Sequence, residues 1–356
     1  MRGMTQPRDV WRIDRAGSLA RLTRRTEELP DPAPGEVRVA VRAIGLNFAD
    51  VFACLGLYSA TPRGSFIPGL EFAGVVEAVG PASSQDPPGT LRPGDQVIGV
   101  TRFGGYVTAL NVSARHLRPM RPGWSFAESA AFPVQALTAW YGLVRLGEIQ
   151  RNDVVLLHSA AGGVGLNALA ILAATGARAI ATVGGAAKRA WLVEHRGLAA
   201  EHVIVRDRRS FGRDLDRALA MLGAKGFDLV FDAIAGPYFE PAYRRLRPEG
   251  RLVVYGAADL MPRGVRVNWL RLAARYLRRP RIDPLALVND NRGVLGFNLI
   301  WLWNSAEGLS GAYEALETLI TAPPLVGRRF PFAEAPAALR HLQSGESIGK
   351  VVLETA

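Results

Sequence analysis

A run of small residues near the middle of the chain has the composition of a phosphate-binding turn. It reads His158-Ser159-Ala160-Ala161-Gly162-Gly163-Val164-Gly165 and follows an apolar run, Val154 to Leu157. Gly162 lets the backbone approach a diphosphate, Gly165 allows close packing of a following helix, and the N-terminus of that helix offers unpaired N–H groups. Ala160 replaces the first glycine of the G-x-G-x-x-G pattern. The sequence therefore predicts a dinucleotide site at Ala161, Gly162, Gly163, Val164 and Gly165, with a merely structural turn as the alternative.

The residues downstream of this turn indicate which dinucleotide fits. A site for NAD usually has an acidic residue about 20 positions further on, where it holds the ribose hydroxyls. The stretch from Thr182 to Arg189 has no acid and includes Gly184 and Lys188. Lys188 is placed to attract a 2′-phosphate, and Arg206 could add a planar cation against the phosphate or the adenine. We expect NADPH as the cofactor; the alternative is that both side chains are ordinary solvated cations.

The residue types leave few ways to hold a metal ion. The chain has 356 residues, one cysteine, Cys54, and five histidines. One cysteine forms neither an intrachain disulfide nor a four-cysteine zinc site, and the histidines lack metal-site spacing. We therefore expect no metal and a reducing, cytoplasmic compartment. No apolar run approaches the ~20 residues that span a bilayer, so we expect a soluble protein.

Two kinds of periodicity divide the chain into two regions of one α/β protein. From about residue 125 onward, helices alternate with short apolar strands, which predicts a doubly wound parallel sheet. The first third has alternating, β-type runs separated by turns, and the end of the chain is expected to rejoin it. The expected strands of the first third are 37–43, 74–79 and 95–100. Those that follow are 154–157, 179–183, 202–205, 229–232, 252–255, 294–299 and 350–353, and the expected helices include 165–175, 213–222 and 311–321.

Positive charge is concentrated in one stretch. The net charge is +11, and Arg244 to Arg281 alone holds eleven arginines and two acids, a net charge of +9. Within it, 269–279 has helical spacing, with arginines on one stripe and Trp269, Leu272 and Tyr276 on another. We interpret this helix as a solvated face over a packed apolar face; docking on an anionic membrane or an acidic carrier protein is the alternative. Nucleic-acid binding is disfavoured, because the aromatic residues belong to the apolar stripe.

Further motifs are spread along nearly the whole chain: Gly45 to Asp50, Gly56 to Tyr58, Gly69 to Gly74, Gly104 to Tyr106, Gln135 to Trp140 and Ile348 to Leu353. Together with the glycine turn, they resemble the zinc-free quinone oxidoreductase branch of the medium-chain dehydrogenase/reductase superfamily. Asp283 to Asn291 and Gly296 to Leu299 resemble the subgroup of vesicle amine transport protein homologues. The resemblance implies a GroES-like, β-rich catalytic domain at residues 1–130, completed by 300–356, a Rossmann domain at 131–299, and a homodimer.

The resemblance also implies roles for individual residues. Zinc alcohol dehydrogenases of this superfamily have a Cys ligand at the position of Asn47 and a His at that of Leu70, so their metal site is not expected here. Asn47 should lie beside the nicotinamide, and Tyr58 should border the substrate, where it could donate a hydrogen bond to a developing enolate or quinol oxygen. Another tyrosine expected in these enzymes is replaced by Phe52, so Tyr58, Asn47 and water stay open as the proton donor. Phe52, Leu70 and Phe103 are expected around the substrate, although core packing explains them equally well. Further cofactor contacts are expected at Thr138, Ala233, Gly256, Phe297, Asn298 and Lys350.

The chemistry that these expectations allow is narrow. Without a Lewis acid, hydride must go to an acceptor that is already electrophilic, such as a quinone or a carbon–carbon double bond conjugated to a carbonyl. The sequence therefore predicts a zinc-independent, NADPH-dependent quinone or enone reductase. One alternative is an enoyl-thioester reductase whose arginine-rich segment recruits a carrier protein. The other is an NADPH-binding membrane-surface protein with incidental reductase activity.

Overall fold

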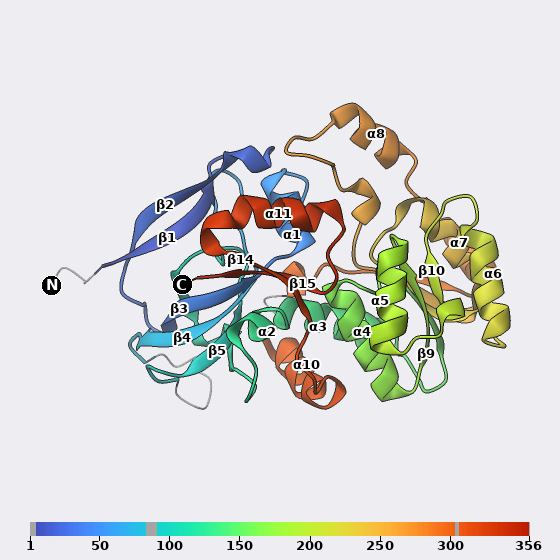
Figure 1. Ribbon diagram of the computed structural model, residues 1–356, viewed down its shortest axis with the longest axis horizontal. Helices are drawn as coiled ribbons and strands as arrows, with labels where there is room; N and C mark the ends of the chain where they lie inside the picture. The colour runs from blue at the N-terminus through green and yellow to red at the C-terminus, as the bar shows by residue number, and fades with distance from the viewer. Residues whose placement is uncertain (1–4, 83–90, 303–305, 356) are drawn as a thin grey trace.

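The glycine-rich turn lies in a six-stranded, fully parallel sheet. The computed structural model describes residues 5–82, 91–302 and 306–355, and its parallel sheet has the strand order β10-β9-β8-β11-β12-β13 (Figure 1). This order confirms the predicted doubly wound topology. The strands are β8 (Val154–Leu157), β9 (Arg178–Val183), β10 (Val203–Val205), β11 (Phe227–Asp232), β12 (Leu246–Val254) and β13 (Gly293–Gly296).

Helices on both faces of this sheet account for the apolar runs. Every residue of β8 is buried, as a strand covered on both sides requires. The helices are α3 (Pro133–Trp140), α4 (Gly163–Thr175), α5 (Ala186–Arg196), α6 (Phe211–Met221) and α7 (Phe239–Tyr243). Helix α4 follows the glycine turn directly and ends at Gly176, whose φ of 76° is the left-handed conformation that glycine adopts readily. The turn is therefore fixed between a buried strand and a packed helix.

The end of the chain completes the second, mostly antiparallel sheet, as expected. Its strand order is β14-β15-β3-β4-β5-β7, with β6 pairing with β3, and β15 runs antiparallel to β3. These strands are β3 (Glu36–Gly45), β4 (Glu71–Val79), β5 (Gln96–Val100), β6 (Ala109–Ser113), β7 (Leu117–Pro119), β14 (Val326–Pro331) and β15 (Lys350–Glu354). Around them lie α1 (Phe48–Cys54), α2 (Phe126–Ala130), α10 (Ala306–Leu319), α11 (Ala335–Ser344) and a hairpin of β1 (Gln6–Ile13) with β2 (Leu22–Leu29). This is the GroES-like sheet domain.

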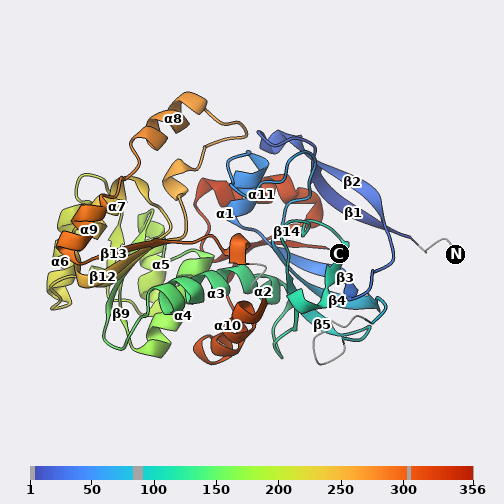
Figure 2. The same cartoon turned by 180° about the vertical axis from the view of Figure 1, so that it is seen from behind.

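Two expectations from the sequence need correction. Strand β13 ends at Gly296, and a 3₁₀ turn, η7 (Leu299–Leu302), occupies the end of the expected strand 294–299. Helix α8 (Trp269–Leu277) forms where predicted, but none of its residues is buried, and Trp269 is 64% exposed. The packed apolar face was therefore a wrong interpretation. Figure 2 shows the reason: α8 stands at the edge of the molecule, away from both sheets.

A segment between β12 and α8 ties the two sheets together. Met261 packs into the core of the antiparallel sheet, and the Nε2 of Gln343 in α11 donates hydrogen bonds to the carbonyls of Pro262 (2.8 Å) and Gly264 (3.0 Å). The backbone N–H of Leu19 binds the carbonyl of Val265 at 3.0 Å. The chain thus leaves the parallel sheet, contacts the other domain and returns. Among the helices of the described ranges, none is long and apolar enough to cross a membrane.

Candidate cofactor and substrate site

The glycine turn is built so tightly that side chains would not fit at key positions. A Cβ added to Gly165 would lie 2.5 Å from the carbonyl oxygen of Ser159, and one added to Gly163 would lie 2.8 Å from Oε1 of Gln135. At Gly162, the N-cap of α4, an added Cβ would meet only Ser159 among the described residues, at 3.4 Å. The open side of Gly162 at a helix N-terminus is the arrangement that a diphosphate requires.

Both domains contribute to the surroundings of this turn. The backbone N–H of Gly349, just before β15, donates to the carbonyl of Ala161 at 2.8 Å. Gly349 adopts a φ of 71°, and an added Cβ would lie 2.5 Å from the carbonyl of Leu325. The return strand therefore brings Lys350 next to the turn, which the sequence motif at the chain's end could not show by itself.

Two cations lie at the end of β9, where a 2′-phosphate would be recognised. Arg206 donates from Nη1 to Thr182 Oγ1 at 3.0 Å, and its guanidinium lies 5.8 Å from the ring centroid of Tyr238. Lys188 donates to the carbonyl of Gly345 in the other domain at 2.6 Å. Burial and the charge of Arg206 lower the pKa of Lys188 to about 8. Among the described residues no carboxylate forms a salt bridge with either cation, so the pair suits an added dianion.

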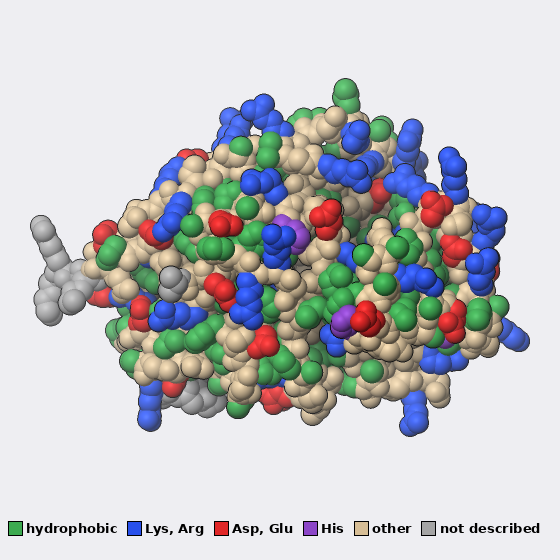
Figure 3. Space-filling view, viewed as in Figure 1, with side chains coloured by type: hydrophobic (Ala, Val, Ile, Leu, Met, Phe, Trp, Pro, Cys, Tyr) green, Lys and Arg blue, Asp and Glu red, His purple; other side chains and the backbone are tan. Residues whose placement is uncertain are grey.

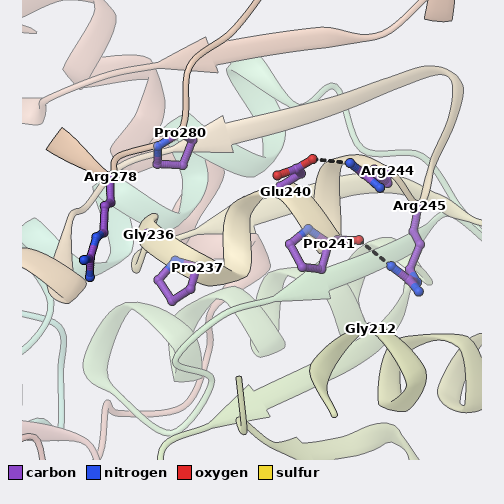
Figure 4. A pocket seen from close by; sticks show the side chains of 9 residues that line it. All are labelled: Gly212, Gly236, Pro237, Glu240, Pro241, Arg244, Arg245, Arg278 and Pro280. Carbon is purple, nitrogen blue, oxygen red and sulfur yellow. Dashed lines mark hydrogen bonds and ion pairs between the residues drawn. The ribbon is translucent and has the colours of Figure 1, made fainter. Parts of the chain in front are cut away.

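A cavity of about 460 Å³ is lined in part by Gly236 and Pro237, which precede Tyr238 in the chain. Figure 4 shows Pro237 and Pro241 next to each other on its wall, with Arg278 on one side and Arg245 on the other. Arg245 donates to the carbonyl of Pro241 at 2.8 Å and pairs with Asp216 on α6. Of the arginines that line this cavity, Arg244 is paired with Glu240 and Arg245 with Asp216, so the positive charge there is partly neutralised.

The other expected cofactor residues lie at the carboxyl ends of the parallel strands or on the facing helix. An added Cβ at Gly256 would lie 2.7 Å from the carbonyl of Ala233, so these two residues form one close-packed edge. The ring of Phe297 lies 5.0 Å from that of Tyr141. Thr138 is buried, and its hydroxyl donates to the carbonyl of Val134 within α3. Contacts of these residues with a cofactor remain predictions.

Asn47 is the centre of a buried polar network that joins both domains. Its Oδ1 accepts hydrogen bonds from Gln135 Nε2 (2.6 Å) and Lys350 Nζ (3.0 Å), and its Nδ2 donates to Glu71 Oε1 (2.9 Å) and the carbonyl of Gly45 (3.3 Å). The amide of Asn47 therefore uses all its donors and acceptors within the protein. A contact between this amide and a nicotinamide would have to compete with these bonds.

A buried ion pair is part of the same network. Lys350 is 3% exposed and Glu71 is fully buried, and their Nζ and Oε1 atoms are 2.5 Å apart. The other oxygen of Glu71 accepts from the backbone N–H of Val134 at 2.8 Å. Burial lowers the pKa of Lys350, while the carboxylate of Glu71 opposes that shift. The ammonium is thus committed to the protein interior, and its expected contact with the cofactor remains a prediction.

A second buried carboxyl group lies beside Asn47. Asp50 Oδ2 accepts from the backbone N–H of Asn47 (2.8 Å) and from the hydroxyl of Tyr106 (3.1 Å). Its Oδ1 has no partner among the described residues. Burial raises the pKa of Asp50 to about 7, which makes it a weaker acid than an exposed aspartate.

Tyr58 lies where the two domains meet. Its hydroxyl donates to Asn298 Oδ1, just after β13, at 2.7 Å, and burial raises its pKa to about 12. Tyr58 and Phe103 pack against a small apolar cluster that includes Leu70 and Ile300. Phe103 has a φ of 84°, a strained conformation of the kind found at functional sites. The structure thus brings Leu70 and Phe103 together with Tyr58, whereas Phe52 packs against the core of the antiparallel sheet.

Sequence reasoning did not assign roles to Glu71, Gln135 and Asp50. All three are buried polar residues, and all three stand inside motifs otherwise made of small and apolar residues. That contrast was the available signal. Within the described ranges, no group of three or more His, Cys, Asp or Glu residues is arranged to hold a metal ion.

Comparisons with known proteins agree with this fold. Residues 33–139 match the alcohol dehydrogenase GroES-like domain, and residues 198–353 match the family described as zinc-binding dehydrogenase. The synaptic vesicle membrane protein VAT-1 homologs of Danio rerio and Rattus norvegicus are each 32% identical, over 90% and 91% of this chain. The chain spans 64% of the length of the first and 78% of the second.

Solved structures of two enzymes are also similar to this chain over nearly its whole length. The quinone oxidoreductase of Thermus thermophilus, also solved with NADPH, is 32% identical with a TM-score of 0.75, over 97% of this chain and 99% of that one. The CurK enoyl reductase is 26% identical with a TM-score of 0.78, over 99% and 100% of the two chains.

The fold, the glycine turn and these matches define an oxidoreductase of the medium-chain dehydrogenase/reductase superfamily. Within that superfamily, the chain belongs to the VAT-1-like quinone oxidoreductase subgroup.

Proposed function

We propose that this protein is a zinc-independent, NADPH-dependent reductase of quinones or α,β-unsaturated carbonyl compounds. The observation that carries the proposal is the Tyr58–Asn298 hydrogen bond, which places a phenol and a carboxamide from different domains beside an apolar cluster. The open turn at Gly162 and the cations Lys188 and Arg206 support NADPH as the cofactor, which the Thermus thermophilus relative binds.

In this proposal the bound cofactor supplies hydride, and the protein residues hold the acceptor. Because the pKa of Tyr58 is about 12, its hydroxyl keeps its proton at neutral pH, and it donates to the acceptor's carbonyl oxygen once this single hydrogen leaves Asn298 Oδ1. Negative charge that develops on this oxygen is then stabilised, while the apolar residues around Tyr58 exclude water from the reacting atoms. Asn298 orients the phenol from the other domain.

The side chains around Asn47 support a reaction without zinc. An amide and an apolar side chain stand at Asn47 and Leu70, and neither is a ligand that zinc prefers. The carboxylate of Glu71 is already neutralised by the ammonium of Lys350 at 2.5 Å. The protein thus holds its own cation at a place where an unpaired buried carboxylate would otherwise favour an added one.

A substrate panel tests the proposal. Purified protein should oxidise NADPH with a quinone or a simple enone, and much more slowly with a saturated ketone or aldehyde, because only conjugated acceptors need no Lewis acid. Turnover with saturated carbonyls alone would contradict it. The resemblance to the CurK enoyl reductase makes enoyl thioesters the second candidate class of substrate. Faster turnover with an enoyl thioester than with a quinone or a simple enone would support an enoyl-thioester reductase instead.

We further propose a homodimer formed around β13 and the segment 265–288. β13 is the last strand of the parallel sheet, so one of its edges is unpaired within the described part of the chain. The segment 265–288, which includes α8, carries many large exposed hydrophobic side chains: Val265, Trp269, Leu270, Tyr276, Leu277, Ile282, Leu285 and Val288. Figure 3 shows hydrophobic and basic side chains together at the upper edge, over α8. A second copy would cover this surface; an anionic membrane is the alternative.

A further inference from the structure

Among the described residues, the guanidinium of Arg206 has one hydrogen-bond partner, the hydroxyl of Thr182, and it also lies over the ring of Tyr238. Arg206 Nη1 lies 3.0 Å from Thr182 Oγ1, and an added Cβ on Gly184 would lie 3.5 Å from its Nη2. Burial lowers the pKa of Arg206, but a guanidinium stays protonated at neutral pH. The cation therefore lies over the turn that follows β9, beside Lys188.

Thr182 has a second partner, the imidazole of His158. The Nδ1 of His158 lies 2.9 Å from Thr182 Oγ1, and both residues are completely buried. A guanidinium only donates hydrogen bonds, so Oγ1 accepts from Arg206. The one hydrogen of the hydroxyl then has Nδ1 of His158 as its only acceptor among the described residues. This accounting favours the neutral tautomer of His158 with its hydrogen on Nε2, an atom that has no partner among the described residues, and burial keeps the imidazole neutral by lowering its pKa to about 4.

We propose that His158 and Thr182 are positioning residues that fix Arg206 for the 2′-phosphate of NADPH. The three residues lie at the carboxyl ends of β8, β9 and β10, which are adjacent in the sheet. The relay runs from His158 through the hydroxyl of Thr182 to the guanidinium. Its effect is preorganisation: a long side chain held in one rotamer loses less entropy when the phosphate binds. The inference depends on the proposed role of Arg206 in cofactor recognition.

Thr182→Val tests the relay, because valine keeps the shape of threonine and removes the hydroxyl. The probe is adenosine 2′,5′-bisphosphate, measured by calorimetry against 5′-AMP, which lacks the 2′-phosphate. Thr182→Val should weaken binding of the bisphosphate roughly 5- to 20-fold, the range of one charge-assisted hydrogen bond, and that of 5′-AMP by less than about 2-fold. Thr175→Val removes a half-buried hydroxyl at the end of α4 and serves as the matched control, with no change expected.

Arg206→Ala separates the relay from the cofactor site itself. If Arg206→Ala weakens bisphosphate binding and Thr182→Val adds nothing to it in the double variant, the two residues act as one unit. If Thr182→Val binds the bisphosphate normally while Arg206→Ala binds it weakly, the positioning role of His158 and Thr182 is overturned. The role of Arg206 in binding the 2′-phosphate would then still stand. If Arg206→Ala binds the bisphosphate as well as the wild type does, the proposed 2′-phosphate site is overturned. His158→Phe, which keeps an aromatic ring beside Phe211, should reproduce Thr182→Val and replaces it if that variant does not fold.

Discussion

At the scale of residues, Tyr58 is the side chain on which the chemistry depends most. Its phenol is largely buried, hydrogen-bonded to Asn298 and protonated at neutral pH. Asn47, to which the family resemblance gave a place beside the nicotinamide, has all its amide atoms bound within the protein instead. Motifs in the sequence identified both residues, but they could not show that, among the described residues, the phenol has one hydrogen-bond partner whereas the amide of Asn47 has four.

Tyr58→Phe should slow enone reduction without changing cofactor affinity. The substitution removes one hydrogen-bond donor from the developing oxyanion, which in comparable sites lowers kcat roughly 10²-fold or more. Steady-state kinetics with a simple enone measure the loss, and calorimetry with NADPH provides the control. An unchanged kcat would remove Tyr58 from the mechanism.

Asp50 should make the stability of the protein depend on pH. Its pKa is about 7 when folded and about 4 when unfolded, so between these values only the folded state holds the proton. The free energy of unfolding should therefore fall as pH rises from about 4 to 7, and this contribution should level off above 7. Urea titrations of the wild type and Asp50→Asn at several pH values test this. The difference in unfolding free energy, variant minus wild type, should increase over that range by up to a few kcal/mol. Parallel pH profiles would mean that Asp50 titrates normally.

At the scale of elements, the glycine turn is the feature that sequence and structure describe most alike. Strand β8 has the predicted bounds, and α4 begins within two residues of the prediction, because the alternation of buried strand, glycines and apolar helix is local in sequence. The buried pair of Glu71 and Lys350 could not be foreseen in the same way. Its partners are 279 residues apart and meet only when β15 pairs with β3.

Gly165→Ala should disrupt the turn, whereas Gly185→Ala should be tolerated. A methyl group at Gly165 would lie 2.5 Å from the carbonyl of Ser159, while at Gly185 nothing described lies within 4 Å. Gly185 has a φ of −167°, an extended conformation open to any residue. Gly165→Ala should weaken NADPH binding at least about 10-fold or lower stability by about 1–3 kcal/mol. Equal behaviour of the two variants in calorimetry and thermal melts would contradict the description of the turn.

Lys350→Met should destabilise the protein strongly, because it leaves the carboxylate of Glu71 buried without its cation. Breaking a buried pair costs about 3–5 kcal/mol, and adding Glu71→Gln should recover much of that loss. The exposed pair of Arg329 and Glu354 on β14 and β15 is the control, and Arg329→Met should cost less than about 1 kcal/mol. Denaturant unfolding measures all three variants. A small cost for Lys350→Met alone would show that the network contributes little to the fold.

At the scale of the whole molecule, the two sheets share one apolar core, which includes Ala43 and Val352 of the antiparallel sheet and Val155 and Phe231 of the parallel sheet. The return of β15 to the antiparallel sheet was predictable from the family motif at the end of the chain, whereas the exposure of α8 was not. An amphipathic pattern shows that a helix has an apolar stripe, but it does not show whether this chain or another surface covers it. The division at residues 130 and 300 stays a prediction.

Replacing Leu270 and Leu285 with aspartate should convert the proposed dimer to a monomer. Both side chains are highly exposed, 87% and 72%, so the change should not affect folding of the single chain. Light scattering after gel filtration measures the mass of the wild type and the variant. A monomeric wild type that pellets with anionic vesicles, and loses this binding in high salt, would favour the membrane as the occupant of this surface.

The most direct test of the account is NADPH oxidation with an enone by protein that has been dialysed against a strong chelator and shown by metal analysis to contain no zinc. Because the proposed conjugated acceptors need no Lewis acid, we expect turnover equal to that of undialysed protein. Turnover that disappears on dialysis and returns only with added zinc would contradict the central claim.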